Sequence, residues 1–251
     1  MMNWLIHPGV LVLIAAIPCL RAPAMAETEN APLSAEQVVN NLVQKNLERA
    51  QALMSYEGTR IYRLDYHGLG SRTAEMIVDV KYQSPATKEF TIRSETGSKL
   101  LIDRVFKKLL QTEKEALAED NQKRTALNPE NYLFTMVDYE TTPDGPLYIL
   151  QVEPRVKNKF LYRGRIWIDG NDFAVTRIEG EPAKNPSFWT KDTKIEQIYA
   201  KVGDFWLPAM NRSASTIRLG GRASFSIEYK DYQITAATPL IKSDRTIAGR
   251  H

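Results

Sequence analysis

Few residues in this sequence combine the type and the spacing that catalysis requires. Glu179 and Glu181 flank Gly180, so on a strand their carboxylates would share one face, as paired catalytic acids can. A solvated strand end explains them better and is the favoured interpretation. His67 and His251 are the only histidines after residue 26, and the acidic residues show no metal-ligand spacing. We therefore expect no catalytic site, no metal and no cofactor.

Sequence motifs for nucleophilic, zinc-dependent and nucleotide-dependent chemistry are also missing. The sequence contains no G-x-S-x-G, no H-E-x-x-H, no P-loop and no Gly-rich dinucleotide fingerprint. The formal net charge of +3 is too small to indicate nucleic-acid binding. With 43% hydrophobic and 25% charged residues, the composition is typical of a globular domain.

The N-terminus predicts export. Residues 10–17 are apolar, but this run is too short to cross a bilayer as a helix. Small residues at Ala24 and Ala26 are typical of a signal-peptidase site, so we expect cleavage after Ala26 and a mature domain of residues 27–251. An uncleaved membrane anchor is the alternative. Cys19, the single cysteine, would leave with the signal peptide, and disulfides would then be excluded.

Two amphipathic helices are predicted. Ser34 and Gln37 have the spacing of a capping box, and apolar residues recur at helical spacing from Val38 to Met54. A second helix is predicted from Ser98 to about Asp120, with a charged far end. Each helix would bury one apolar stripe.

About ten strands are predicted in the remaining sequence, because apolar residues there alternate with a period of two. The segment "DGND" at residues 169–172 predicts a tight hairpin, and a change of face near Asp231 predicts a bulge. Short turns join most strands, so the sheet should be antiparallel. We expect an α+β, mainly β fold with one curved antiparallel sheet and a helix on its concave face, although an ordinary two-layer α+β domain would show the same pattern.

The segment "YRGRIWIDGNDFAVTRIEGEPAKNPSFWTK" at residues 162–191, followed by "VGDFWLPA" at 202–209, carries a family resemblance. These phrases resemble the C-terminal half of bacterial exported proteins related to the LolA-type outer-membrane lipoprotein-sorting family. The order of elements over residues 34–235 also fits. The resemblance implies a periplasmic protein whose curved antiparallel sheet forms an open half-barrel, covered by an N-terminal helix and a helical lid. In this family the half-barrel holds acyl chains of lipids or lipoproteins. No position here is matched to the functional arginine of the carriers.

Apolar residues of the lid, the strands and one long loop are the candidate ligand contacts. Leu101, Val105 and Leu109 would form the lid stripe, although simple core residues would show the same pattern. Phe188 and Trp189 lie in a proline-containing loop that would close the rim, either as a structural plug or in contact with ligand. The strand candidates are Met76, Val78, Phe90 and Ile92.

A basic, partly apolar stretch could serve anionic headgroups, although a solvated strand face is the favoured interpretation. Its cations are Arg155, Lys157, Lys159, Arg163 and Arg165. The expected partners are a lipid or lipoprotein acyl chain and an envelope membrane protein, without nucleic acid. The main alternative function is a periplasmic sensor domain of the same fold that binds a protein.

Overall fold

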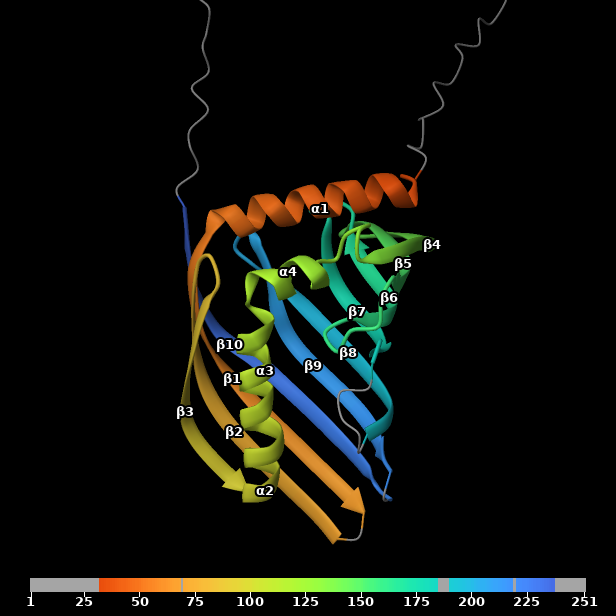
Figure 1. The fold of residues 1–251 in the computed structure, drawn as a ribbon. Helices are drawn as coiled ribbons and strands as arrows, with labels where there is room; N and C mark the ends of the chain where they lie inside the picture. The colour runs from red at the N-terminus through yellow and green to blue at the C-terminus, as the bar shows by residue number, and fades with distance from the viewer. Residues whose placement is uncertain (1–31, 69, 185–189, 219, 238–251) are drawn as a thin grey trace, which may run out of the picture. The chain divides into compact units, whose positions relative to one another are not determined.

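Ten strands form one antiparallel sheet, in the order β3-β2-β1-β10-β9-β8-β7-β6-β5-β4. The computed structural model describes residues 32–68, 70–184, 190–218 and 220–237. The sheet curves around the helices and stays open between β3 and β4 (Figure 1). The strands are β1 (Leu53–Gly68), β2 (Gly70–Gln83), β3 (Thr87–Gly97), β4 (Tyr132–Thr142), β5 (Gly145–Pro154), β6 (Tyr162–Asp169), β7 (Ala174–Pro182), β8 (Thr190–Val202), β9 (Phe205–Ile217) and β10 (Arg222–Ala236).

Two helical segments pack on one face of this sheet, which we call the inner face. The first is α1 (Ala35–Ala52), which lies across one end of the sheet (Figure 1). The second, called the lid segment below, connects β3 to β4. It comprises α2 (Lys99–Leu101), the π-helix η1 (Ile102–Phe106), α3 (Lys107–Ala116) and α4 (Glu119–Thr125). The predicted fold class, a mainly β curved sheet covered by two helical segments, is confirmed.

The capping box predicted at the start of α1 is present. Ser34 Oγ accepts a hydrogen bond from the Gln37 amide at 3.3 Å, and Gln37 Oε1 accepts one from the Ser34 amide at 2.9 Å. The predicted extension of this helix to Met54 is wrong. Leu53 is paired with Ala236 of β10, so sheet pairing takes over from the helix at this residue.

The lid segment differs from the single second helix that the sequence predicts. Residues Ile102–Phe106, near its start, are π-helical, and the helix is interrupted after Ala116, where Leu117 and Ala118 separate α3 from α4. The start at Ser98 is as predicted. The lid segment joins the two edge strands of the sheet, β3 and β4, so its ends are fixed at opposite edges.

One row of cross-strand neighbours shows how the inner face is built. The row is apolar at both ends and polar at Gln197 and Asn211, whose side chains are hydrogen-bonded at 2.9 Å. This polar pair lies between two apolar clusters, one packed under α1 and the other under the lid segment. In order from β5 to β2, the row is Leu150, Ile166, Ile178, Gln197, Asn211, Ile227, Tyr62 and Met76.

Two predicted local features are confirmed. Asp231 has a positive φ of 56°, and the β1–β10 register shifts between Glu57 and Thr59, so β10 carries the bulge. At the predicted hairpin, Asp169 Oδ1 accepts the amide hydrogens of Asn171 at 3.0 Å and Asp172 at 2.7 Å. These bonds hold the turn between β6 and β7.

Candidate functional site

The apolar contact between the lid segment and the sheet is the candidate binding surface. One apolar stripe of the lid segment is buried in the second apolar cluster and consists of Ile102, Phe106 and Leu110. On the sheet side, Met76 and Val78 of β2 meet them and are 0% exposed. Lid segment and sheet are therefore packed directly against each other, and an acyl chain could enter between them only if the lid segment moved.

The lid residues singled out from the sequence lie beside this buried stripe. Leu101 and Val105 are partly buried and pack against the same cluster, whereas Leu109 is 37% exposed. The sequence offers two adjacent apolar stripes, one residue apart, and the helix turns the 102/106/110 stripe inward. The ligand-binding role of Leu101, Val105 and Leu109 stays a prediction.

The strand and loop candidates fall into three groups. Met76 and Val78 are fully buried under the lid segment. Phe90 packs against the cluster, but Ile92, also on the edge strand β3, is 40% exposed. Phe188 and Trp189 lie outside the described residues.

A buried arginine occupies the inner face beside the apolar surface. Arg60 of β1 is only 5% exposed, and its Nη1 donates to Tyr62 Oη at 3.2 Å. The guanidinium lies between two rings, with Cζ 5.0 Å from the centroid of Tyr229 and 5.7 Å from that of Phe90. Such cation–π contacts stabilise a desolvated cation but leave its charge unneutralised.

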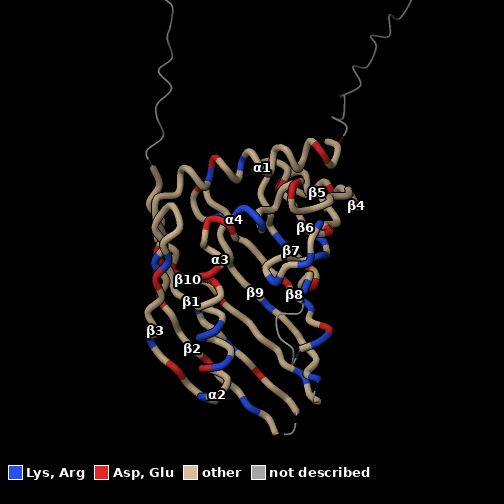
Figure 2. Tube along the Cα trace, viewed as in Figure 1, with Lys and Arg blue, Asp and Glu red and all other residues tan. Residues whose placement is uncertain are grey.

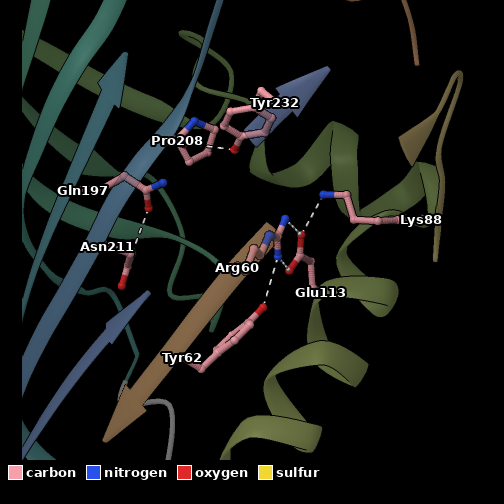
Figure 3. Close-up of polar contacts among 8 residues, drawn as sticks. All are labelled: Arg60, Tyr62, Lys88, Glu113, Gln197, Pro208, Asn211 and Tyr232. Carbon is pink, nitrogen blue, oxygen red and sulfur yellow. Dashed lines mark hydrogen bonds and ion pairs between the residues drawn. The ribbon is translucent and has the colours of Figure 1, made fainter. Parts of the chain in front are cut away.

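Glu113 of α3 supplies the negative charge (Figure 3). Its carboxylate accepts two bonds from Arg60, at 2.6 Å and 3.0 Å, in bidentate geometry. Lys88 of β3 donates to the same carboxylate at 2.7 Å. Because Arg60 and Lys88 belong to the sheet and Glu113 to the lid segment, this cluster fastens the lid segment to the sheet.

The pKa values follow from this arrangement. Burial by itself would raise the pKa of Glu113, but the hydrogen bonds and charges of Arg60 and Lys88 outweigh it and lower the pKa to about 2. Burial likewise opposes the charge of Arg60, yet Glu113 raises its pKa above the ordinary value. Both groups stay charged at neutral pH.

The sequence does not predict this cluster, because Glu113 belongs to the charged far end of the predicted second helix, where an acidic residue is expected on the surface. A signal for Arg60 was present. The period-two pattern of β1 places it on the same face as Tyr62 and Leu64, so an arginine occurs where an apolar residue is expected. The pairing with Glu113 could not be inferred, since it depends on how the lid segment crosses the sheet.

The predicted basic stretch is largely engaged in local contacts. Arg163 pairs with Glu181 at 2.6 Å, and Lys159 pairs with Glu115 of α3 at 3.0 Å. Arg155 Nε donates to the Pro129 carbonyl at 2.8 Å. Figure 2 shows acidic and basic residues interspersed over the sheet and the lid segment.

A cleft of about 880 Å³, with a mixed polar and apolar lining, lies along the opposite, outer face of the sheet. It is lined by a row of charged residues that are paired across adjacent strands, namely Arg165, Glu179, Glu196 and Arg212. Arg177 and Arg212 both pair with Glu196, so much of this charge is internally neutralised.

The described residues show neither a metal-binding cluster nor a membrane-spanning helix. No group of three or more His, Cys, Asp or Glu side chains is placed to hold a metal ion within residues 32–237, apart from their undescribed gaps. In the same residues, no helix is both long and apolar enough to cross a membrane.

Comparisons with known proteins find likeness only among solved structures. No protein-family model matches the chain, and no curated protein matches it. The chain is similar to a domain from Vibrio parahaemolyticus assigned to the outer membrane lipoprotein-sorting proteins, with 13% identity over 84% of this chain and 97% of that one, at a TM-score of 0.40. A LolA superfamily protein from Nitrosomonas europaea has 10% identity over 82% and 96%, at a TM-score of 0.38.

A third similar structure is a chain of the MucA/MucB complex from Pseudomonas aeruginosa. The identity is 11% over 81% of this chain and 99% of that one, at a TM-score of 0.23. All three TM-scores are below 0.5 and all three identities are 13% or lower, so these likenesses assign neither a family nor a function to this chain.

Proposed function

We propose that this protein is an exported, periplasmic binding protein that holds the acyl chain of a lipid or lipoprotein between its lid segment and the inner face of its sheet. The observation that carries this proposal is the apolar contact of Ile102, Phe106 and Leu110 with β1, β2 and β10. Displacing the lid segment would expose this surface, and an acyl chain would cover it again at about 0.8 kcal/mol per buried CH₂.

The construction of the lid segment supports this proposal. Its π-helical turn contains Ile102 and Phe106, two of the largest fully buried side chains, and π-helical turns often occur at functional sites. The polar cluster at Arg60 adds a contact that can open and re-form. Binding of this kind is passive and needs no catalytic residue.

Hydrogen exchange with a bound acyl probe tests the proposal. A fluorescent twelve-carbon fatty acid should bind saturably, and unlabelled fatty acid should displace it. Amides of residues 102–116 should lose protection in the bound state, because the lid segment moves, whereas amides of β5 and β6 should not change. Absence of saturable binding would overturn the proposal.

Native mass spectrometry and a pull-down together distinguish this function from the protein-binding alternative. Native mass spectrometry of protein purified from the periplasm should detect copurified lipid. An empty protein that captures one envelope membrane protein would favour a sensor domain instead.

A further inference from the structure

The charges at the lid contact do not balance. Arg60 and Lys88 both bind Glu113, and within the described residues no other carboxylate forms an ion pair with either cation. Both side chains are largely withdrawn from water, with Lys88 only 11% exposed. The inner face therefore carries one buried positive charge more than the lid segment neutralises.

The two cations are held in place without the lid. Arg60 lies between Tyr229 and Phe90, and Lys88 Nζ lies 5.8 Å from the ring centroid of Tyr56 and 5.9 Å from that of Tyr82. All of these rings belong to strands β1, β2, β3 and β10. When the lid segment leaves, Glu113 leaves with it, and a guanidinium and an ammonium remain side by side in an aromatic wall.

Such a pair is suited to an anion. A guanidinium matches a carboxylate or phosphate with two parallel hydrogen bonds, as it already does with Glu113. The apolar surface that the lid segment would expose, Met76 and Val78, belongs to the same cluster as Tyr56 and Tyr62. The exposed face would thus offer an apolar wall and an anion site together.

We propose that Arg60 and Lys88 form a headgroup site for an anionic amphiphile, in which a carboxylate or phosphate attached to an acyl chain replaces the carboxylate of Glu113. Glu113 occupies the site in the absence of ligand and so competes with it. This inference rests on the proposed function and specifies in addition that the ligand is negatively charged.

Matched amphiphiles test the headgroup site. Calorimetric titration of the full protein with dodecanoate and with uncharged monolaurin, both below their micellar concentrations, should show dodecanoate binding at least about tenfold more tightly, as expected for an added charge-assisted contact. Inorganic phosphate alone should bind much more weakly than dodecanoate, because it has no acyl chain.

Single substitutions identify the residues. Lys88→Gln keeps the Arg60–Glu113 pair and should bring the dodecanoate-to-monolaurin preference close to one. Lys81→Gln is the matched control, since Lys81 pairs with Glu57 in solvent and its loss removes the same charge. Glu113→Gln should tighten dodecanoate binding several-fold, because the competing carboxylate is gone.

The outcomes separate the two proposals. Equal binding of dodecanoate and monolaurin, or equal effects of Lys88→Gln and Lys81→Gln, would overturn the headgroup site and leave acyl binding intact. Phosphate binding as tight as that of dodecanoate would also overturn it, in favour of a free anion. Binding of neither amphiphile would overturn the proposed function itself.

Discussion

Trp206 donates its indole Nε1–H to Asp172 Oδ2 at 2.8 Å, which joins the two segments that carry the sequence resemblance. Asp172 closes the β6–β7 hairpin, and Trp206 belongs to "VGDFWLPA" at the start of β9. Lys201 pairs with the same carboxylate at 2.6 Å, and Arg49 of α1 donates to the Asp172 main-chain carbonyl. Residues far apart in the sequence thus fix one hairpin against α1 and β9.

Trp206→Phe removes the indole donor from this hairpin and keeps an aromatic ring. We expect the free energy of unfolding to fall by about 1 kcal/mol, the usual net contribution of one hydrogen bond, as measured by urea denaturation. In an Asp172→Ala background the same substitution should cost nearly nothing more. Equal costs in both backgrounds would show that the bond contributes nothing.

Glu113→Gln leaves Arg60 and Lys88 buried without a counter-charge. We expect the free energy of unfolding to fall by about 3 kcal/mol, as for a buried ion pair that loses one partner. Glu115→Gln is the control two residues away, because its partner Lys159 is half exposed, and it should cost less than about 1 kcal/mol. Similar costs for both would contradict the fastening role of the cluster.

Acidification should release the lid segment before it unfolds the sheet. The pKa of Glu113 is lowered from 4.5 to about 2, so its contribution to stability is complete above about pH 4.5 and is lost as the pH falls toward 2. Hydrogen exchange of α3 amides should accelerate through this window. The effect should be absent in Glu113→Gln, and an identical profile in that variant would refute the assignment.

Phe106→Ala tests which stripe of the lid segment is buried. Phe106 is fully buried, so its truncation should cost about 3–5 kcal/mol, whereas Leu109→Ala should cost below about 1 kcal/mol because Leu109 is 37% exposed. Thermal and urea melts of the two variants measure the difference. A larger cost at Leu109 would indicate that the helix is turned the other way.

Mass spectrometry of the N-terminus checks export. Cleavage after Ala26 should give a mature chain that begins with Glu27. A diacylated Cys19 would contradict this and would attach the protein to a membrane.

Much of the fold could be predicted because it depends on local patterns. The strands, the capping box at Ser34 and the bulge near Asp231 all follow from spacing along the chain. The end of α1 could not be predicted, since Leu53 joins β1 through its pairing with Ala236 at the other end of the described chain.

The site was less predictable for the same reason. The lid segment has apolar residues at both 101/105/109 and 102/106/110, and only its packing on the sheet decides which stripe is buried. Glu113 has the appearance of an ordinary surface acid until the lid segment brings it to Arg60. Long-range contacts of this kind leave no periodic trace in the sequence.

The adjacency of β1 and β10 has a consequence for how this chain folds. Leu53 is paired with Ala236, so two neighbouring interior strands of the sheet come from nearly the two ends of the described chain. Pairing between such distant residues makes folding slow, because the entropy cost of bringing the two ends together comes before any stabilisation by their contact. In a chain exported N-terminus first, as we propose for this one, β1 would wait with one side unpaired until β10 had emerged. The order of the strands would thus delay completion of the sheet until β10 had crossed the membrane.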